Sequence, residues 1–337
     1  MAGTVAAGAS AEPKAEQKTE SPALRLLRRW GTIIVLLATA VGFALASPYF
    51  ATISNANNIL FSMIVSALVS MGLTWVVMAG SFDLSVGLTV TTSSIVVAFL
   101  IPLVGPWAAI VLALASACVI GLANGLLVTY GRLSGIVVTL GVMFVLDGIN
   151  VFATGGYQVA VSYSESAFLY IGQGKLGFIG VPVIIMLVIF VLAQLLATRT
   201  RVGHYVAAVG DNPMAAFYSG INVYRWVIVS FVLSALMSGV AGIILTSISS
   251  SAQPVGGQGY LLEAFAAVFL GATVLGKGKP HILGTLIGVL FLYLVNSGMN
   301  MVGFPFAARQ LFAGLVLIIA VGANAALNRE ELHLKFI

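Results

Sequence analysis

Long and mostly uncharged apolar stretches recur along the chain, and they constrain its fold more than any other feature. A helix needs about 20 apolar residues to cross the hydrocarbon core of a bilayer. Lipid offers no partner to free backbone amides and carbonyls, which favours helices, and the stretches are too long and uniform for barrel strands. We therefore predict an all-α, polytopic transmembrane helical bundle of about ten spans, at residues 31–47, 58–80, 87–104, 107–129, 135–153, 179–197, 223–248, 262–276, 282–300 and 308–326.

The overall composition excludes an ordinary soluble domain. Hydrophobic residues make up 60% of the chain and charged residues only 7%, whereas soluble domains carry about 25% charged residues. A soluble fold of this size cannot hide so much apolar surface, so the lipid bilayer is the first expected partner. The net charge of +5 comes without a basic stripe, which argues against nucleic acid.

Cysteine and histidine usage gives no sign of a metal or another cofactor. The single cysteine, Cys118, excludes an internal disulfide and a cysteine-based metal cluster. The three histidines, His204, His281 and His333, are far apart in the sequence. We therefore expect no cofactor and no metal site.

Charge placement predicts the topology. We expect residues 1–22 to be a disordered tail, 23–327 to be one transmembrane domain, and 328–337 to be a second tail. If the N-terminus is cytoplasmic and the ten spans alternate, 13 of the 15 Lys and Arg residues fall on the cytoplasmic side, and only Lys175 and Arg309 fall outside. This asymmetry predicts an inner-membrane protein with both termini in the cytoplasm.

A faint internal repeat accompanies this topology. A shift of 172 residues aligns Asn124 with Asn296 and Gly131 with Gly303, and it lays the second span on the seventh. These two spans run in opposite directions in the predicted topology. The pattern suggests an inverted repeat, which is common in transporters.

The segment 198–222 is the longest predicted cytoplasmic connection between spans. Asp211 and Asn212 are good N-caps, Pro213 suits the first helical position, and Gly220 suits a helix end, which predicts a short helix from Pro213 to Ser219. Small residues on this helix would allow another protein to approach closely, although the segment could also be a simple connector. The candidate coupling residues are Gly210, Asp211, Asn212, Pro213, Ala215, Ala216, Ser219 and Gly220.

Polar residues within or beside the spans are candidates for a substrate pathway. A charged Asp at the membrane centre costs about 2.5–3.5 kcal/mol on insertion scales, so it should face protein or water. Helix capping and interhelical hydrogen bonds are the structural alternatives for these residues. The candidates are Asp83, Ser85, Asn124, Asp147, Glu263, Asn296 and Asn300.

Catalytic motifs do not stand out in the sequence. We find no Ser-His-Asp set and no HExxH motif, so we do not expect an enzyme. The stretch from Gly271 to Lys277 has the early spacing of a phosphate-binding loop, but Gly278 follows the lysine where that motif needs Ser or Thr. If transport uses ATP, a separate chain must bind it.

Four segments together resemble the ribose-type permeases of bacterial ABC sugar importers, and the resemblance extends from the first span to about residue 326. They are Asp83-Leu-Ser-Val-Gly87, then Asn124-Gly-Leu126 with Gly131 and Thr139-Leu-Gly141, then Gly210-Asp-Asn212 with Ala215-Ala216 and Ser219-Gly-Ile221, and finally Ser251-Ala252, Pro254, Gly257, Gly259-Tyr260, Ala266-Ala-Val268 and Gly284-Thr-Leu-Ile-Gly288. The resemblance implies import of a monosaccharide or related polyol. It also implies three kinds of partner, namely an ABC ATPase subunit that docks on the 198–222 loop, a periplasmic sugar-binding protein, and a second permease chain in a homodimer or heterodimer.

The sequence departs from the family pattern at three places, which bear on the choice of substrate. Asp147 stands where the family often has Arg, Leu261-Leu262-Glu263 stands where it often has Glu-Leu-Asp, and His204 stands where Arg is common. An ABC permease for branched-chain amino acids is the nearest alternative, although the Asp83–Gly87 element favours the sugar branch. An ion-coupled secondary transporter, with Asp147 and Glu263 as proton sites, is the alternative from another class.

Overall fold

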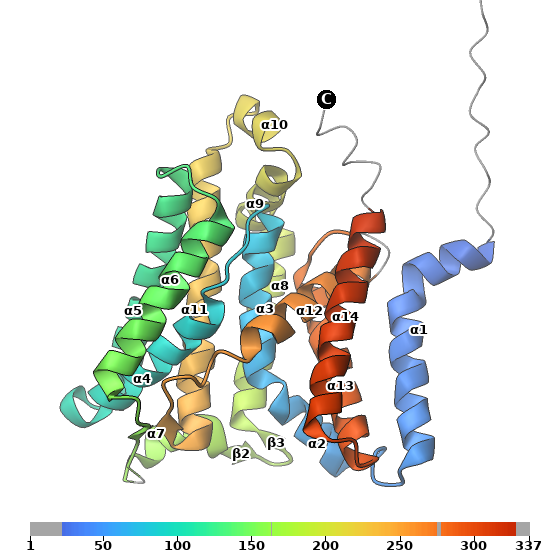
Figure 1. Cartoon of the computed structure of the whole chain (residues 1–337), viewed down its shortest axis with the longest axis horizontal. Helices are drawn as coiled ribbons and strands as arrows, with labels where there is room; N and C mark the ends of the chain where they lie inside the picture. Colours follow the sequence, from blue (N-terminus) through green and yellow to red (C-terminus); the bar gives the residue numbers. More distant parts are fainter. Residues whose placement is uncertain (1–21, 163, 275–277, 328–337) are drawn as a thin grey trace, which may run out of the picture.

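The computed structural model describes residues 22–162, 164–274 and 278–327, and this part of the chain is an almost entirely helical bundle (Figure 1). The tails predicted at 1–22 and 328–337, apart from Pro22, lie outside the described residues. The helices are α1 Pro22–Ala46, α2 Ile53–Ser62, α3 Ile64–Met78, α4 Val86–Val104, α5 Pro106–Thr129, α6 Gly135–Thr154, α7 Ser166–Gln173, α8 Val181–Arg199, α9 Arg201–Asp211, α10 Pro213–Tyr218, α11 Val223–Ser249, α12 Tyr260–Thr273, α13 Ile282–Met301 and α14 Phe306–Leu327.

Each predicted span coincides with helical structure, and the all-α membrane bundle is confirmed. Within the described ranges, six helices are long and apolar enough to cross a membrane, namely α4, α5, α6, α8, α11 and α13. The bent pair α2 and α3 makes a seventh if it counts as one span. The apolar parts of α1, α12 and α14 are shorter there, so the count of ten spans stays a prediction.

The second predicted span is broken. The sequence 58–80 reads as one helix, but α2 and α3 meet at Met63 with a bend of 48°. Thr52 caps α2 by accepting a hydrogen bond from the amide of Asn55 at 3.2 Å. The apolar pattern continues across the break without Gly or Pro, so the sequence holds no signal for the bend.

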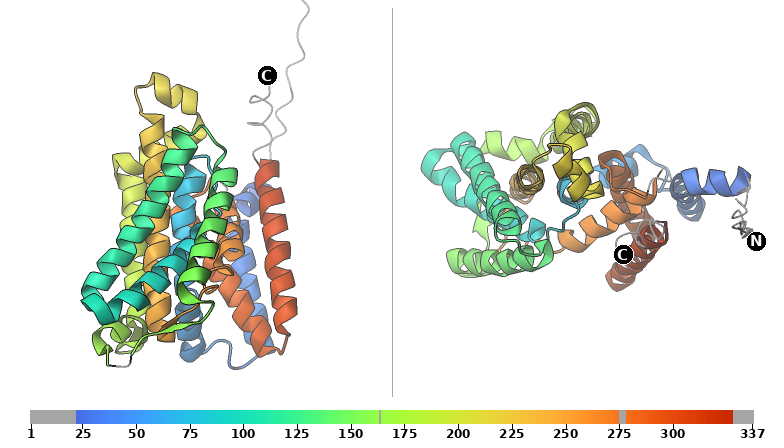
Figure 2. Two further views of the ribbon diagram at one scale, coloured as in Figure 1. Left: turned by 60° about the vertical axis from the view of Figure 1, so that its left-hand side comes forward. Right: turned by 90° about the horizontal axis from the view of Figure 1, so that it is seen from above.

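The centre of the bundle is formed by α3 and α11. Every residue of α3 from Ile64 to Val76 is buried, which fits a mostly apolar stretch. The hydroxyls of Ser70 and Thr74 donate to backbone carbonyl oxygens of the preceding turn. Helix α11 packs against α3, α4 and α5. Seen from above, α4 to α6 lie on one side of this centre and α12 to α14 lie on the other (Figure 2).

Small residues allow the helix backbones to approach closely. A Cβ atom at Gly121 of α5 would lie 2.6 Å from the carbonyl oxygen of Phe231 in α11. The Gly284–Gly288 pair of α13 leaves equally little room against the backbones of Gly271 and Ala267 in α12. A GxxxG pair of this kind allows two helix backbones to come into close contact.

Short elements cover the two ends of the bundle, and of these the sequence analysis predicted only the helix at Pro213–Ser219. At one end lie α7 and two small antiparallel sheets, in which β1 Val159–Ala160 pairs with β4 Ser251–Ala252 and β2 Lys175–Leu176 pairs with β3 Ile179–Gly180. Helices α9 and α10 lie at the opposite end (Figure 1). The two ends are therefore structurally distinct.

The close contact at Gly121 predicts a stability effect that a lipid-facing glycine does not share. We expect Gly121→Ala to lower the thermal midpoint of the protein in detergent, because overpacking a tight contact costs about 1–3 kcal/mol. Gly141 of α6 is the matched control, since no atom lies within 4 Å of a Cβ placed there, and Ala is the better helix former. Equal midpoints for the two variants would contradict the packing described for α5 and α11.

Candidate functional site

The predicted short helix in the 198–222 segment is present as α10. The Asn212 side chain accepts a hydrogen bond from the amide of Ala215 at 3.0 Å, Pro213 occupies the first turn, and Gly220 has the left-handed φ of 81° that a glycine tolerates best. The expectation for Asp211 as a cap is wrong. Asp211 is the last residue of α9 and forms an ion pair with Lys279 at 2.8 Å, because the chain starts α10 only after Asn212.

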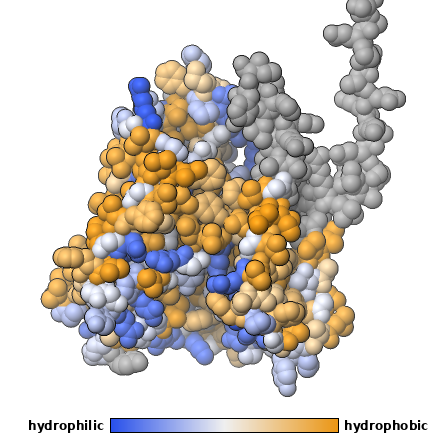
Figure 3. Space-filling view, in the orientation of Figure 1, coloured by the Kyte–Doolittle hydropathy of each residue, from blue (hydrophilic) through white to orange (hydrophobic). Residues whose placement is uncertain are grey.

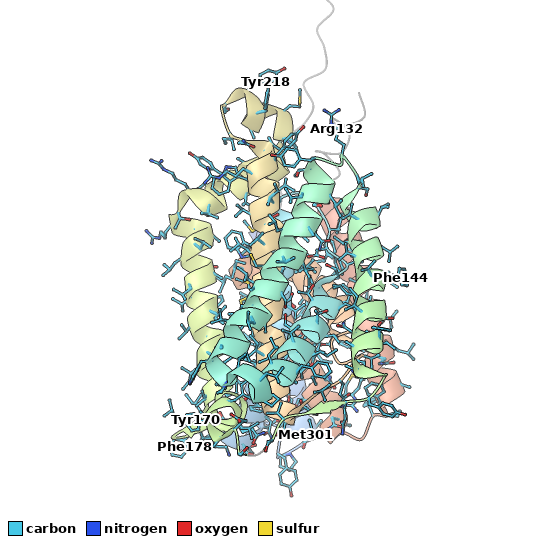
Figure 4. The ribbon with its side chains drawn as sticks, turned by 90° about the vertical axis from the view of Figure 1, so that its left-hand side faces the viewer. Arg132, Phe144, Tyr170, Phe178, Tyr218 and Met301 are labelled. Atoms are coloured by element: carbon cyan, nitrogen blue, oxygen red, sulfur yellow. The ribbon has the colours of Figure 1, made fainter. Side chains whose placement is uncertain are left out.

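The outer surface of α10 is aromatic and apolar. Met214, Phe217 and Tyr218 are 63%, 65% and 79% exposed, and Ala216 is buried. Of the small residues expected to meet a partner, Ala215 and Ser219 are exposed, and Ala216 faces the bundle because it lies on the inner side of this one-and-a-half-turn helix. Beside α10 lies a groove of about 660 Å³, bordered also by Ile221 and Tyr224. Tyr218 lies at the tip of the molecule (Figure 4).

The end of α9 rests on the end of α3. Gly210 has no room for a side chain, since a Cβ atom there would overlap the carbonyl oxygen of Met78. Gly80, with φ of 78°, turns the chain directly beneath Gly210 and leads it toward Asp83. The α9–α10 unit therefore touches the turn that precedes α4.

A buried polar network anchors the beginning of α4. One carboxylate oxygen of Asp83 accepts hydrogen bonds from the amide and hydroxyl of Ser85 at 2.9 and 2.6 Å, and the other accepts from Ser234 of α11 at 3.4 Å. Asn124 of α5 donates to the Ser85 hydroxyl at 2.8 Å. Asp83, Ser85 and Asn124 are at most 1% exposed. These three pathway candidates therefore join α4, α5 and α11 in this conformation.

Asp147 lies in a separate cavity. It is partly exposed on α6 and accepts a hydrogen bond from the side chain of Gln258 at 3.1 Å. The cavity has about 270 Å³ and is bordered by the first turn of α4 at Gly87 and Leu88 and by Leu261 of α12. A carboxylate at this place has both a polar partner and open space, as expected for an acid within a membrane bundle.

A second polar cavity, of about 290 Å³, lies between α2, α13 and α14. Asn296 and Asn300, both predicted candidates, line it together with three residues that the sequence analysis did not single out as site residues, which are Asn55, Asn58 and Arg309. The Arg309 guanidinium donates to the side-chain oxygen of Asn296 at 3.0 Å. We call this space the amide cavity.

Glu263 borders a narrower space that shares wall residues with the amide cavity. Its carboxylate accepts a hydrogen bond from the hydroxyl of Tyr293 at 2.8 Å. Tyr293 and Asn296 lie one turn apart on α13, and both border the amide cavity and a narrower space next to Glu263. Glu263 lies in the first turn of α12.

The structure thus divides the seven pathway candidates into three groups. Asp83, Ser85 and Asn124 form the buried anchor, and Asp147 stands in its own cavity. The remaining three are Asn296 and Asn300 on α13 and Glu263 on α12, which contacts α13 through Tyr293. The sequence does contain a pattern that could have identified the polar residues of α2. Asn55, Asn58 and Ser62 are three and four residues apart, which places them on one face of a helix. Within the described part of the chain, no three His, Cys, Asp or Glu side chains are placed to hold a metal ion.

Polar cavities inside a membrane-spanning bundle serve the movement of a solute across the bilayer, and with this architecture they define a polytopic membrane transporter. Comparison with known proteins gives the particular family. The chain belongs to the family described as "Branched-chain amino acid transport system / permease component", which matches residues 55–321.

Individual relatives cover most of both chains. The ribose import permease of Escherichia coli K12 is 37% identical over 293 residues, which are 86% of this chain and 91% of the relative. The ribose import permease of Bacillus subtilis 168 is 36% identical over 297 residues, with 88% and 92% covered. The L-arabinose ABC transporter permease of Azospirillum brasilense is 32% identical over 301 residues, with 88% and 87% covered.

No solved structure matches the chain. The family match and the relatives make this protein a multi-pass inner-membrane permease subunit of an ATP-binding-cassette importer.

The cavity around Asp147 predicts a transport effect without a folding effect. Asp147→Asn should change the half-saturating substrate concentration or the maximal rate of uptake, because the negative charge is lost while the hydrogen bond from Gln258 can be kept. The amount of protein in the membrane should equal that of the wild type. An uptake curve identical to the wild type would reduce Asp147 to a helix-packing residue.

Proposed function

We propose that this subunit imports a monosaccharide or related polyol, and that a separate ABC ATPase drives it through α10. Three observations support the sugar as substrate. The relatives described above are named for ribose and L-arabinose. The amide cavity offers many neutral donors and acceptors, and the Asp83–Gly87 element belongs to the sugar-type pattern.

The exposed apolar surface of α10 is the observation that carries the coupling proposal. Helix α10 is held by a cap at Asn212 and by a left-handed turn at Gly220, and its aromatic side chains point outward. We call this protruding surface, formed by Met214, Phe217 and Tyr218 beside the groove, the apolar knob. Exposed aromatic side chains of this kind are typical of protein interfaces. The partner for this knob is a groove on the ATPase subunit.

A continuous path of contacts can carry movement from α10 into the bundle. The α9–α10 unit meets the Gly80 turn at Gly210, and this turn leads to the Asp83 anchor at the start of α4. The first turn of α4 in turn borders the Asp147 cavity. Displacement of α10 when the two ATPase subunits close would therefore shift α4 against α6 and alter that cavity.

We assign the α10 end to the cytoplasm. Arg132 lies at the same end as Tyr218, and Phe178 lies at the opposite end (Figure 4). Arg201 lies within the 198–222 loop, and Arg225 lies in the first turn of α11, which follows that loop. Lys and Arg collect on the cytoplasmic side of membrane proteins, which supports this orientation and cytoplasmic termini.

Two further partners complete the proposed importer. The surface of α6 carries the exposed side chains of Phe144, Val145 and Phe152, and Phe144 also borders the Asp147 cavity. A second permease chain, identical or related, would cover the polar opening there and keep it from lipid. On the face shown in Figure 3, hydrophilic side chains gather in the lower half of the bundle, away from α10. That end is where a periplasmic sugar-binding protein would deliver its sugar.

The proposed ATPase contact is tested by charging its central aromatic residue. Phe217→Asp should reduce copurification of the ATPase subunit by roughly tenfold or more, as expected when an interface anchor is lost, and should abolish sugar uptake. Phe178→Asp is the matched control, because Phe178 is 90% exposed at the opposite end and should leave copurification unchanged. Equal copurification with both variants would remove the coupling proposal.

The turn that ends α10 should also be essential for coupling. Gly220→Val places a β-branched residue at φ of 81°, which such side chains rarely adopt, so α10 should lose its orientation. Uptake of ribose should fall to background while insertion into the membrane is retained. Normal uptake by a fully inserted variant would show that α10 needs no fixed orientation.

Two alternative functions have distinct outcomes in the same cells. If branched-chain amino acids are the substrate, unlabelled leucine and not ribose should compete with the transported solute. If Asp147 and Glu263 are proton sites of an ion-coupled transporter, uptake should persist when ATP is depleted and the membrane potential is intact.

A further inference from the structure

Arg309 is a basic residue at an unusual position for a membrane-spanning bundle. It lies in the first turn of α14, and it is one of only two basic residues that the topology puts outside the cytoplasmic side. Its guanidinium donates to Asn296 and lies 5.6 Å from the Phe306 ring, while its Nε atom is buried and makes no hydrogen bond. Arg309 also lines the amide cavity, so a guanidinium group stands in the wall of this polar space.

The walls of the amide cavity are held in place by the bundle. Asn55 donates to the carbonyl oxygen of Phe50 at 2.9 Å and accepts from the hydroxyl of Ser297 at 2.8 Å. Asn296 is fixed by Arg309, and Asn300 is exposed at the rim. Hydrogen bonds between helix residues therefore define the shape of the cavity.

The chemistry of the walls selects a class of ligand. Side-chain amides both donate and accept hydrogen bonds, as the neighbouring hydroxyls of a sugar do. The described walls include one cation, Arg309, and no acid, and Glu263 borders the adjoining narrower space. A volume of about 290 Å³ is just below the roughly 300–1,000 Å³ typical of small-molecule pockets, which suits one sugar ring.

We propose that the amide cavity is a subsite that receives one neutral monosaccharide on the side opposite α10, with Arg309 and Asn300 as specificity-determining residues. The inference rests on the proposed sugar import and adds the place where the sugar first meets the permease. Figure 4 shows Met301, which lines the cavity, at the end of the molecule opposite Tyr218. Asn296 is a positioning residue, because it holds the guanidinium of Arg309 toward the cavity.

Protection of a cysteine from labelling tests this subsite directly. Cys118 is the only cysteine, so Cys118→Ala gives a background for Met301→Cys as the reporter in the cavity. The control is Tyr49→Cys, which is 73% exposed in the loop between α1 and α2 and does not line the cavity. Spheroplasts that contain the permease and its ATPase, but have lost the periplasmic binding protein, are depleted of ATP and treated with a membrane-impermeant maleimide.

The expected result is labelling at both positions and slower labelling at Met301→Cys alone when excess D-ribose is added. Leucine should not protect the reporter. Labelling at Met301→Cys that ribose does not slow, labelling slowed equally at Tyr49→Cys, or no labelling of the reporter from outside would each overturn the subsite.

Substitutions in the walls separate binding from structure. In the Met301→Cys background, Arg309→Gln and Asn300→Leu should each raise the half-protecting ribose concentration by about tenfold, as expected when one good hydrogen bond to the ligand is lost. Arg309→Lys should fall between Arg309→Gln and the parent. The labelling rate without ribose should stay the same in all variants, and an unchanged half-protecting concentration in Arg309→Gln would overturn the role of Arg309.

Sugar uptake, measured after the binding protein has been restored, distinguishes a failure of the subsite proposal from a failure of the proposed sugar import. If the parent takes up ribose but ribose gives no protection, the subsite is wrong and sugar import stands. If the parent takes up no sugar at all while its ATPase is bound, the proposed substrate itself is wrong.

Discussion

The lack of hydrogen-bond partners in lipid is the constraint on which the rest of this structure depends. It forces the backbone into helices, and it favours polar side chains of a span that find a partner inside the bundle or border an open space. The first outcome is seen at Asp83, whose carboxylate is enclosed by Ser85 and Ser234. The second is seen at Asp147 and at the amide cavity. Both the hydrogen-bonded network at Asp83 and the cavities therefore follow from the need to satisfy polar groups within the membrane.

The features on which the proposed function rests are distributed along the length of the bundle. The apolar knob of α10 and the groove beside it lie at one end, and the amide cavity lies toward the other. Between them, the contact of Gly210 with the Gly80 turn connects the end helices to α4 and to the Asp147 cavity. A permease that has no motor of its own needs such a rigid connection, because force applied at its surface must reach the place where the solute passes.

Much of the fold was predictable because helix bounds depend on local chemistry. The helices expected at 87–104, 107–129 and 135–153 are α4, α5 and α6 to within one residue at either end. The cap at Asn212 and the turn at Gly220 were also predictable from residue type. The bend at Met63 and the burial of Ala216 could not be predicted, because both depend on how the neighbouring helices pack.

The sequence by itself determined that this chain is a membrane-spanning helical bundle of the sugar-permease kind with a short capped helix in its 198–222 loop, since hydropathy, caps and motifs act over a few neighbouring residues. Only the tertiary structure decided which polar residues share a space. Asn55, Asn296 and Arg309 are more than 250 residues apart at their extremes, yet they border one cavity because α2, α13 and α14 pack side by side around it. Asp83 and Asn124 lie in the interior for the same reason, because packing against α11 closes the space around them.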